Sequence, residues 1–237
     1  MTTSPIEDLA KALQPLGMIP RGGFVLSEAD ERDLAPFADL ATGKSGRTLI
    51  LIGNAGPAMY RAFFAAGGDH PTGPNPLDTW TRGVIEPIAA KFGARAAFPF
   101  GGPPWLPFQR WAQRAEELKA SPLGILIHPE FGLWHAYRAA LLFEGPMDLP
   151  APAPLGFPCD TCADRPCLTS CPADAVTAAG YSVDKCAPHV AGNAGGECRE
   201  RGCLARRACP VGREYTYPEP ALAFHMAAFL AGRRAAV

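Results

Sequence analysis

The distribution of cysteine constrains this chain most. All eight cysteines lie between Cys159 and Cys209, and the preceding residues contain none. The first eighteen residues lack the basic segment followed by an apolar one that marks a secretory signal. Apolar stretches such as Thr48 to Ile52 are too short to span a bilayer. We therefore expect a cytoplasmic protein with no membrane partner, in which reduced thiols are metal ligands rather than disulfides.

The cysteines form two runs, and each run ends in a Cys-Pro dipeptide. The first is C-x2-C-x4-C-x3-C-P and the second is C-x11-C-x4-C-x5-C-P. The first run resembles the C-x2-C-x2-C-x3-C-P run of bacterial dicluster ferredoxins, with two extra residues before Cys167. By position, that resemblance implies two [4Fe–4S] clusters. One would be held by Cys159, Cys162, Cys167 and Cys209, and the other by Cys171, Cys186, Cys198 and Cys203. The expanded spacing leaves the roles of Cys186 and Cys198 open.

Structural zinc is the alternative for the same thiolates, since two zinc sites with four cysteine ligands each would also use eight. The two Cys-Pro dipeptides, and a CxxC in only one run, favour clusters. Two clusters in one small module would transfer electrons. The cysteine-free part should therefore bind the group that receives those electrons.

The cysteine-free part alternates helix and strand signals, which predicts an α+β fold. Helices are expected from the Ser4–Glu7 capping box to Gly17, over 57–66, from Asn75 to Gly93 and over 107–119. Strands are expected over 47–53, 94–98, 123–128 and 135–143. The expected domains are a core over 1–150, a cluster module over 151–220 and a C-terminal helix over 221–237 that packs on the core. The proline-rich segment 146–158 is the expected connector.

A net charge of −1 argues against a nucleic-acid partner.

The stretch from His128 to Arg138, HPEFGLWHAYR, resembles the HPxFGGWFAxR stretch of the CblC family of cobalamin-processing proteins. The segment AGPAMY after the strand at 47–53 and the helix start NPLDTW are similar to further segments of that family. This resemblance implies a nitroreductase-like core that binds cobalamin. Epoxyqueuosine reductases and reductive dehalogenases are similar to CblC in this core and carry a dicluster ferredoxin module after it, the same order as here.

Five of the six candidate cofactor-binding residues lie in the stretch that carries the resemblance: His128, Phe131, Gly132, Trp134 and Arg138. The sixth, Trp105, is nominated by the aromatic loop over 98–105. His128 either contacts a corrin or is a satisfied loop histidine. Gly132 would permit close approach to a flat macrocycle. Arg138, in an apolar strand, must be paired or reach a cavity. Trp105 ends the aromatic loop over 98–105, which either forms an apolar pocket wall or packs in the core.

These features predict an oxidoreductase: an iron–sulfur corrinoid-processing reductase that reduces bound cobalt for upper-ligand removal or adenosylation. A flavodoxin or a ferredoxin reductase would supply electrons. The alternatives are a cobalamin-dependent reductase of epoxyqueuosine-tRNA or an organohalide, and a plain ferredoxin-type carrier. Flavin in place of cobalamin also remains open.

Overall fold

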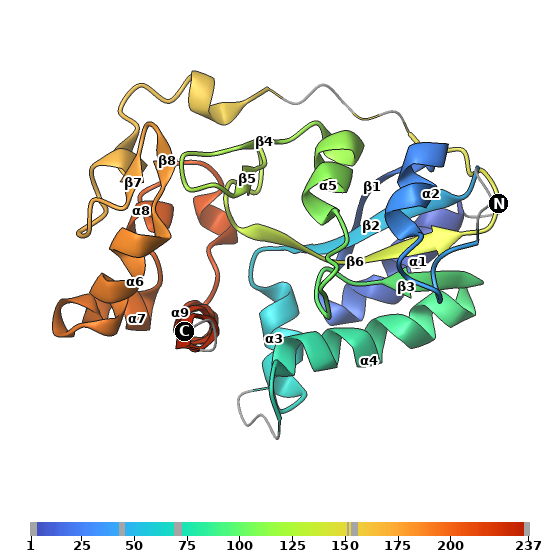
Figure 1. Ribbon diagram of the computed structural model, residues 1–237, viewed down its shortest axis with the longest axis horizontal. Coiled ribbons are helices and arrows are strands. Elements are labelled where there is room, and N and C mark those ends of the chain that lie inside the picture. The colour runs from blue at the N-terminus through green and yellow to red at the C-terminus, as the bar shows by residue number, and fades with distance from the viewer. Residues whose placement is uncertain (1–3, 43–45, 69–72, 151, 153–155, 235–237) are drawn as a thin grey trace. The chain divides into compact units, whose positions relative to one another are not determined.

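The computed structural model describes residues 4–42, 46–68, 73–150, 152 and 156–234 (Figure 1). The chain forms two compact units. The first comprises residues 1–117 and 136–154, and the second comprises residues 118–135 and 155–237. This division differs from the expected boundary at residue 150, because residues 118–135 fold with the cysteines. Part of the expected connector, residues 151 and 153–155, lies outside the described residues.

The first unit is built on a four-stranded sheet. Its strands are β1 (Ile19–Val25), β2 (Thr48–Ala55), β6 (His135–Phe143) and β3 (Ala94–Ala97), in the order β1-β2-β6-β3. The pairs β1–β2 and β3–β6 are antiparallel. β2 is buried along nearly its whole length, as its continuous apolar run predicts. β1 was not predicted.

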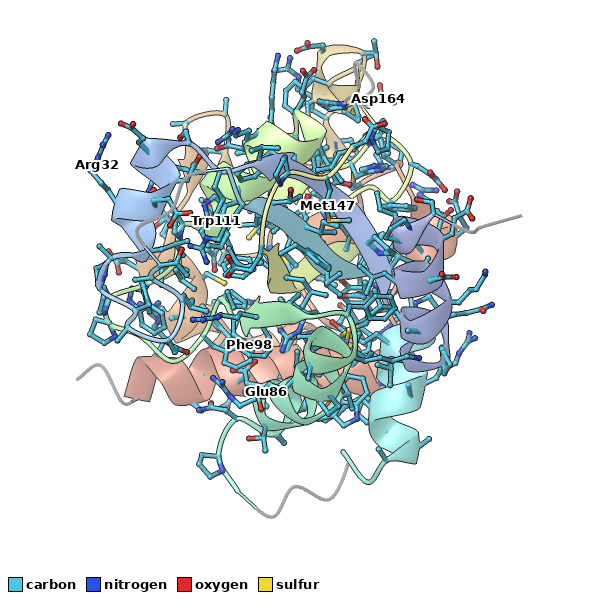
Figure 2. All side chains as sticks on the ribbon, turned by 90° about the vertical axis from the view of Figure 1, so that its right-hand side faces the viewer. Arg32, Glu86, Phe98, Trp111, Met147 and Asp164 are labelled. Carbon is cyan, nitrogen blue, oxygen red and sulfur yellow. The ribbon has the colours of Figure 1, made fainter. Side chains whose placement is uncertain are left out.

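Five α-helices of the described residues accompany this sheet: α1 (Pro5–Leu13), α2 (Glu28–Leu34), α3 (Ala58–Ala65), α4 (Pro76–Lys91) and α5 (Phe108–Glu116). A short 3-10 turn, η1 (Gln14–Leu16), follows α1, and Gly17 ends it in a left-handed conformation. α1 and α5 pack on β1, α3 on β2 and α4 on β3. Phe98, labelled in Figure 2, follows β3. The Arg82 guanidinium of α4 lies 4.4 Å from its ring.

The second unit contains two short hairpins, one of β4 (Lys119–Ala120) with β5 (Leu126–Ile127) and one of β7 (Val176–Thr177) with β8 (Gly180–Tyr181). Its α-helices are α6 (Val183–Ala191), α7 (Gly196–Arg201), α8 (Leu204–Arg207) and α9 (Glu219–Arg234). The 3-10 turns are η2 (Pro158–Asp160), η3 (Pro166–Leu168), η4 (Asn193–Gly195) and η5 (Arg213–Tyr215).

The C-terminal helix α9 packs on α6 and α7 of the cysteine-bearing unit. The sequence had placed it on the core instead. Its buried residues Ala221 and Leu222 account for this packing, and Leu222 lies against Gly202 directly after α7. Among the described residues, no helix combines the length and apolar character needed to cross a membrane.

Candidate functional site: two groups of four cysteines

Four cysteines line one cavity of about 300 Å³ in the second unit: Cys159, Cys162, Cys167 and Cys209. We call these the first quartet. Cys159 lies on η2, Cys167 lies on η3 and Cys209 follows α8. Apolar side chains complete the cavity wall, among them Leu123, Ile127, Leu133, Phe157 and Val211. The cavity is therefore a thiol-lined space with an apolar surround.

The thiols of the first quartet influence one another. Burial raises the pKa of Cys159, and the neighbouring Cys209, Cys167 and Cys162 raise it further. Burial also raises the pKa of Cys209, while a backbone N–H bond from Val211 and the charge of Arg213 oppose this rise. The bond from Val211 and the positive charge both favour a thiolate at Cys209.

The other four cysteines, Cys171, Cys186, Cys198 and Cys203, form the second quartet. Burial raises the pKa of both Cys198 and Cys203, and in each case Cys186 and Cys171 are neighbouring thiols that add to the rise. The Ala175 N–H donates to Cys171 Sγ at 3.4 Å. Cys186 and Cys171 are thus neighbours of both Cys198 and Cys203.

Among the described residues, no group of three or more His, Cys, Asp or Glu side chains is compact enough to hold a single metal ion. In the first quartet, the thiols surround a cavity.

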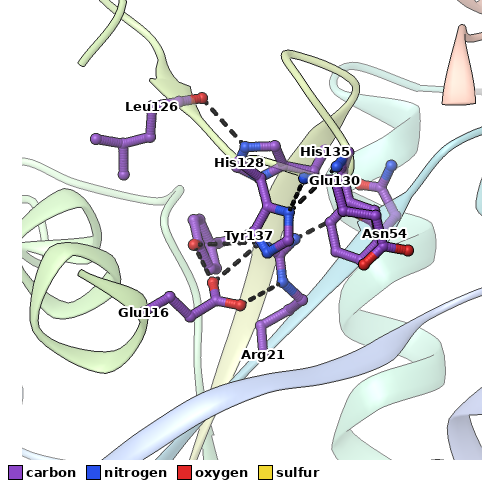
Figure 3. A network of polar contacts seen from close by, with 9 residues as sticks. Arg21, Asn54, Glu116, Leu126, His128, Glu130, His135 and Tyr137 are labelled. Atoms are coloured by element: carbon purple, nitrogen blue, oxygen red, sulfur yellow. Dashed lines mark hydrogen bonds and ion pairs between the residues drawn. The ribbon is translucent and has the colours of Figure 1, made fainter. Parts of the chain in front are cut away.

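The loop after β5 begins at His128, which is 8% exposed. Its Nδ1 accepts hydrogen bonds from the backbone N–H groups of Glu130 and Phe131, each at 3.1 Å (Figure 3). Its ring also stacks on Phe131, with centroids 4.2 Å apart. His128 therefore organises its own loop, and Phe131 in turn meets the ring of Tyr215 edge-on at 5.0 Å.

Gly132 and Trp134 lie in the interior of the second unit. Gly132 has φ +56°, and a Cβ there would lie 2.7 Å from the Val211 carbonyl carbon and closer still to its oxygen. Trp134 is 1% exposed, and its ring meets Tyr217 at 5.5 Å and the Arg206 guanidinium at 4.5 Å. The glycine that the sequence assigned to ligand approach thus permits close approach of the chain that follows Cys209.

Arg138 and Trp105 belong to the first unit. Arg138 Nη2 donates to Asp78 Oδ1 at 2.8 Å and to Thr81 Oγ1 at 3.1 Å. Its Nε is buried and has no hydrogen-bond partner in the described part of the chain. Trp105 is 63% exposed and lines a cavity of about 190 Å³ with Phe100 and Arg82. Arg138 is thus paired through Nη2.

Sequence reasoning missed a buried polar network in the first unit. Arg21 donates from Nε and Nη2 to the Glu116 carboxylate at 2.9 and 3.0 Å, and the Tyr137 hydroxyl donates to the same carboxylate (Figure 3). Arg21 lies at an irregularity in the β1–β2 pairing, beside Gly22 with φ +62°. Such bulges re-aim side chains. The Arg-Gly-Gly sequence within β1 is the only local sign of it.

No family model matches this chain, and no curated protein matches its sequence. Among solved structures, its fold is similar to that of epoxyqueuosine reductase from Streptococcus thermophilus. The TM-score is 0.55 at 17% identity, over 90% of this chain and 67% of that chain. This likeness concerns the fold alone, and it confirms the predicted α+β class and the similarity to epoxyqueuosine reductases at the level of fold.

Two weaker likenesses accompany it. The B12-trafficking protein CblC from C. elegans gives a TM-score of 0.45 at 12% identity, over 94% of this chain and 91% of that chain. An epoxyqueuosine reductase with a modified tRNA stem loop gives 0.48 at 14% identity, over 90% and 66%.

Proposed function

We propose that this chain is an iron–sulfur reductase that holds one [4Fe–4S] cluster in each cysteine quartet and acts on a bound corrinoid. The observation that carries the proposal is the grouping of the eight cysteines into two sets of four. Cys209, at the end of the second run, joins Cys159, Cys162 and Cys167 of the first run around one cavity. This interleaving is the pattern in which the last cysteine of one run serves the other cluster.

The spread of the thiols supports clusters over zinc. In a [4Fe–4S] cluster each cysteine binds a different iron, so the four sulfurs stand around a body of some size. A zinc site draws four sulfurs to about 2.3 Å from one ion. The four thiols of the first quartet line a cavity of about 300 Å³, which fits the first arrangement. When bound, such clusters supply one-electron transfer.

The chain's own groups would tune that transfer. Backbone N–H groups donate to Cys171 and Cys209, and Arg165 and Arg213 place positive charge near the first quartet. Hydrogen bonds to thiolate sulfur and nearby positive charge stabilise the reduced state. The apolar wall from Leu123 to Leu133 limits the access of water to the first quartet.

The proposal of a corrinoid ligand rests on the family resemblance and on the likeness of fold. Arg138 supplies a donor for it, because its Nη2 is fixed by Asp78 and Thr81 while its Nε stays buried and unsatisfied. Buried donors are seldom left without an acceptor, and a corrin amide oxygen is a suitable one. Trp105 offers an exposed aromatic face in the same unit.

The other four nominated residues belong to the second unit, where His128 and Phe131 shape the loop and Gly132 and Trp134 hold it in place. The proposed outcome is reduction of cobalt for upper-ligand removal or adenosylation, with electrons from a flavodoxin or a ferredoxin reductase.

The cluster assignment is tested with one variant per quartet. Cys162→Ala and Cys186→Ala should each lose about half of the roughly eight irons and eight acid-labile sulfides per chain. Each should also retain the paramagnetic signal of the other cluster after dithionite reduction. A colourless protein whose thiols bind only zinc would refute the proposal.

The corrinoid is tested separately, by electron paramagnetic resonance of cob(II)alamin added anaerobically to the cluster-loaded protein. We expect the nitrogen splitting from the lower base to disappear on binding. Arg138→Gln should weaken binding, while Arg110→Gln, in an exposed ion pair with Asp33, should not. An unchanged cob(II)alamin spectrum in a protein with intact clusters would refute corrinoid binding. Binding of flavin mononucleotide would then identify a flavin-linked reductase, and its absence a plain electron carrier.

The fold likeness to epoxyqueuosine reductase favours a second candidate, in which the same parts reduce a modified nucleoside in tRNA. This candidate runs against the expectation that no nucleic acid is bound. Incubation of the reduced, corrinoid-loaded protein with epoxyqueuosine-containing tRNA distinguishes the two. Formation of queuosine supports the second candidate, and conversion of cyanocobalamin without it supports the first.

A further inference from the structure

One short helix joins the two quartets. α8 follows Cys203 of the second quartet and precedes Cys209 of the first. Cys203 is its N-cap, and the Cys203 carbonyl accepts from the Arg207 N–H at 3.1 Å. At the other end, the Cys209 N–H donates to the Arg206 carbonyl at 3.3 Å. α8 also packs on η3, which carries Cys167. A single helical turn, with a rise of about 1.5 Å per residue, thus keeps ligands of both quartets close together.

The Arg206 side chain ties this helix to the loop after β5. Its Nε donates to the Leu133 carbonyl oxygen at 3.1 Å, and its Nη2 donates to the same oxygen. Bonds from a charged donor are stronger than those between neutral groups, and the planar guanidinium fixes the direction of both. Leu133 is 1% exposed, so this link lies in the interior of the second unit.

Two buried rings lie against the Arg206 guanidinium. Its carbon lies 4.5 Å from the centre of the Trp134 ring and 4.9 Å from that of the Tyr217 ring. These two residues are 1% and 3% exposed, and their rings meet edge-on at 5.5 Å. A desolvated guanidinium is attracted to aromatic rings at such distances. The hydrogen bonds and the rings together restrict the side chain to one position, and α8 with it.

We propose that Arg206 is a positioning residue that holds the two clusters in one fixed arrangement relative to each other. This inference rests on the proposed function and assigns a residue to the pair of centres. A helix of one turn has little stability of its own and depends on tertiary packing. Arg206 supplies that packing midway between Cys203 and Cys209. Loss of its contacts therefore lets these two cysteines, and the clusters that they bind, move relative to each other.

The test is Arg206→Lys, which keeps the positive charge and removes the planar group that makes both bonds. Electron paramagnetic resonance is recorded after both clusters have been reduced. Two reduced clusters at a short, fixed separation split each other's lines, so their joint spectrum is not the sum of the two separate spectra. The Cys162→Ala and Cys186→Ala proteins supply the separate spectra. We expect split lines in the wild type and their loss in Arg206→Lys at unchanged iron content.

The matched control is Arg233→Lys, the same replacement in an exposed arginine of α9 whose guanidinium lies 5.9 Å from the Phe229 ring. Its split lines should match those of the wild type. Split lines retained in Arg206→Lys with full iron content would overturn the inference. So would a wild-type spectrum that equals the sum of the two separate spectra, because the clusters would then have no close, fixed arrangement.

A second variant covers loss of iron in Arg206→Lys. Tyr217→Leu leaves both bonds to Leu133 in place and removes one of the two rings, so the split lines should weaken at full iron content. Unchanged lines would overturn the inference. A wild-type protein that holds no [4Fe–4S] cluster would instead refute the proposed function, and this inference with it.

Discussion

Replacing Gly132 by alanine distinguishes two interpretations of the loop after β5. The sequence resemblance assigns the small size of this residue to a bound macrocycle, and the structure shows it against the Val211 carbonyl. Gly124 in the same unit is the matched control. It has φ +77°, and a Cβ there would meet nothing within 4 Å. Both substitutions strain the backbone, and only Gly132→Ala also forces a methyl group against the main chain.

The expected magnitudes follow from these environments. A left-handed conformation costs an ordinary residue about 1–2 kcal/mol, which is the full effect expected for Gly124→Ala. Overpacking adds about 1–3 kcal/mol, and backbone atoms relax less readily than a flexible side chain. Gly132→Ala should therefore lower the free energy of unfolding of the cluster-loaded protein by about 2–5 kcal/mol.

Urea unfolding followed by circular dichroism measures both variants. Because the Val211 N–H donates to Cys209, Gly132→Ala should also lose iron from the first quartet before the second. A variant no less stable than Gly124→Ala would contradict this account. Loss of corrinoid binding with unchanged stability and iron content would restore the assignment of Gly132 to the ligand.

Two further predictions concern the first unit. Glu31 and Arg47 form a buried pair, with side chains 8% and 2% exposed and a contact of 2.6 Å. Glu31→Gln leaves the guanidinium uncompensated and should lower the free energy of unfolding by about 3–5 kcal/mol. Glu86→Gln, in an exposed pair, should change it by less than about 1 kcal/mol. Equal effects in chemical unfolding would show that burial does not matter here. Burial raises the pKa of Tyr137 above its ordinary 10.0, with Arg21 opposing and Glu116 adding to the rise. The folded chain therefore holds this proton more tightly than the unfolded chain. The resulting stability is complete below pH 10 and declines as the pH rises further. Unfolding measured from pH 8 to 11 should show a steeper alkaline decline in wild type than in Tyr137→Phe, and parallel curves would contradict this.

Much of the secondary structure of the first unit could be predicted, because its elements have clear apolar patterns and clear start and stop residues. β2 is a continuous apolar run, and α4 begins after Asn75 and ends before Gly93, as expected. β1 was missed because Pro20, Gly22 and Gly23 interrupt any strand pattern. Proline and glycine are tolerated there because β1 is an edge strand with a bulge. The expected strand over 123–128 shortens to Leu126–Ile127, since Gly124 takes a positive φ in the preceding turn.

The grouping of the cysteines is a prediction from the resemblance to dicluster ferredoxins, whereas the surroundings of the cysteines could not be predicted from the sequence. The resemblance supplies a pairing pattern for a run of cysteines that ends in Cys-Pro. The contact between Gly132 and Val211 joins two segments far apart in the chain, and a single sequence does not encode that pairing visibly. A glycine with positive φ looks the same in sequence whether a ligand or a backbone approaches it.

The nested order of the two quartets has a consequence for assembly. The loop from Cys159 to Cys209 encloses every ligand of the second quartet, because Cys171 and Cys203 both lie within it. Metal binding at the second quartet therefore orders the segment between the ligands of the first quartet. Bringing the ligands of the first quartet together costs less entropy when this segment is already ordered. Under limiting iron, Cys186→Ala should lower occupancy of the first quartet more than Cys162→Ala lowers occupancy of the second. Equal effects in both directions, measured by iron analysis and by the two paramagnetic signals, would show that the sites fill independently.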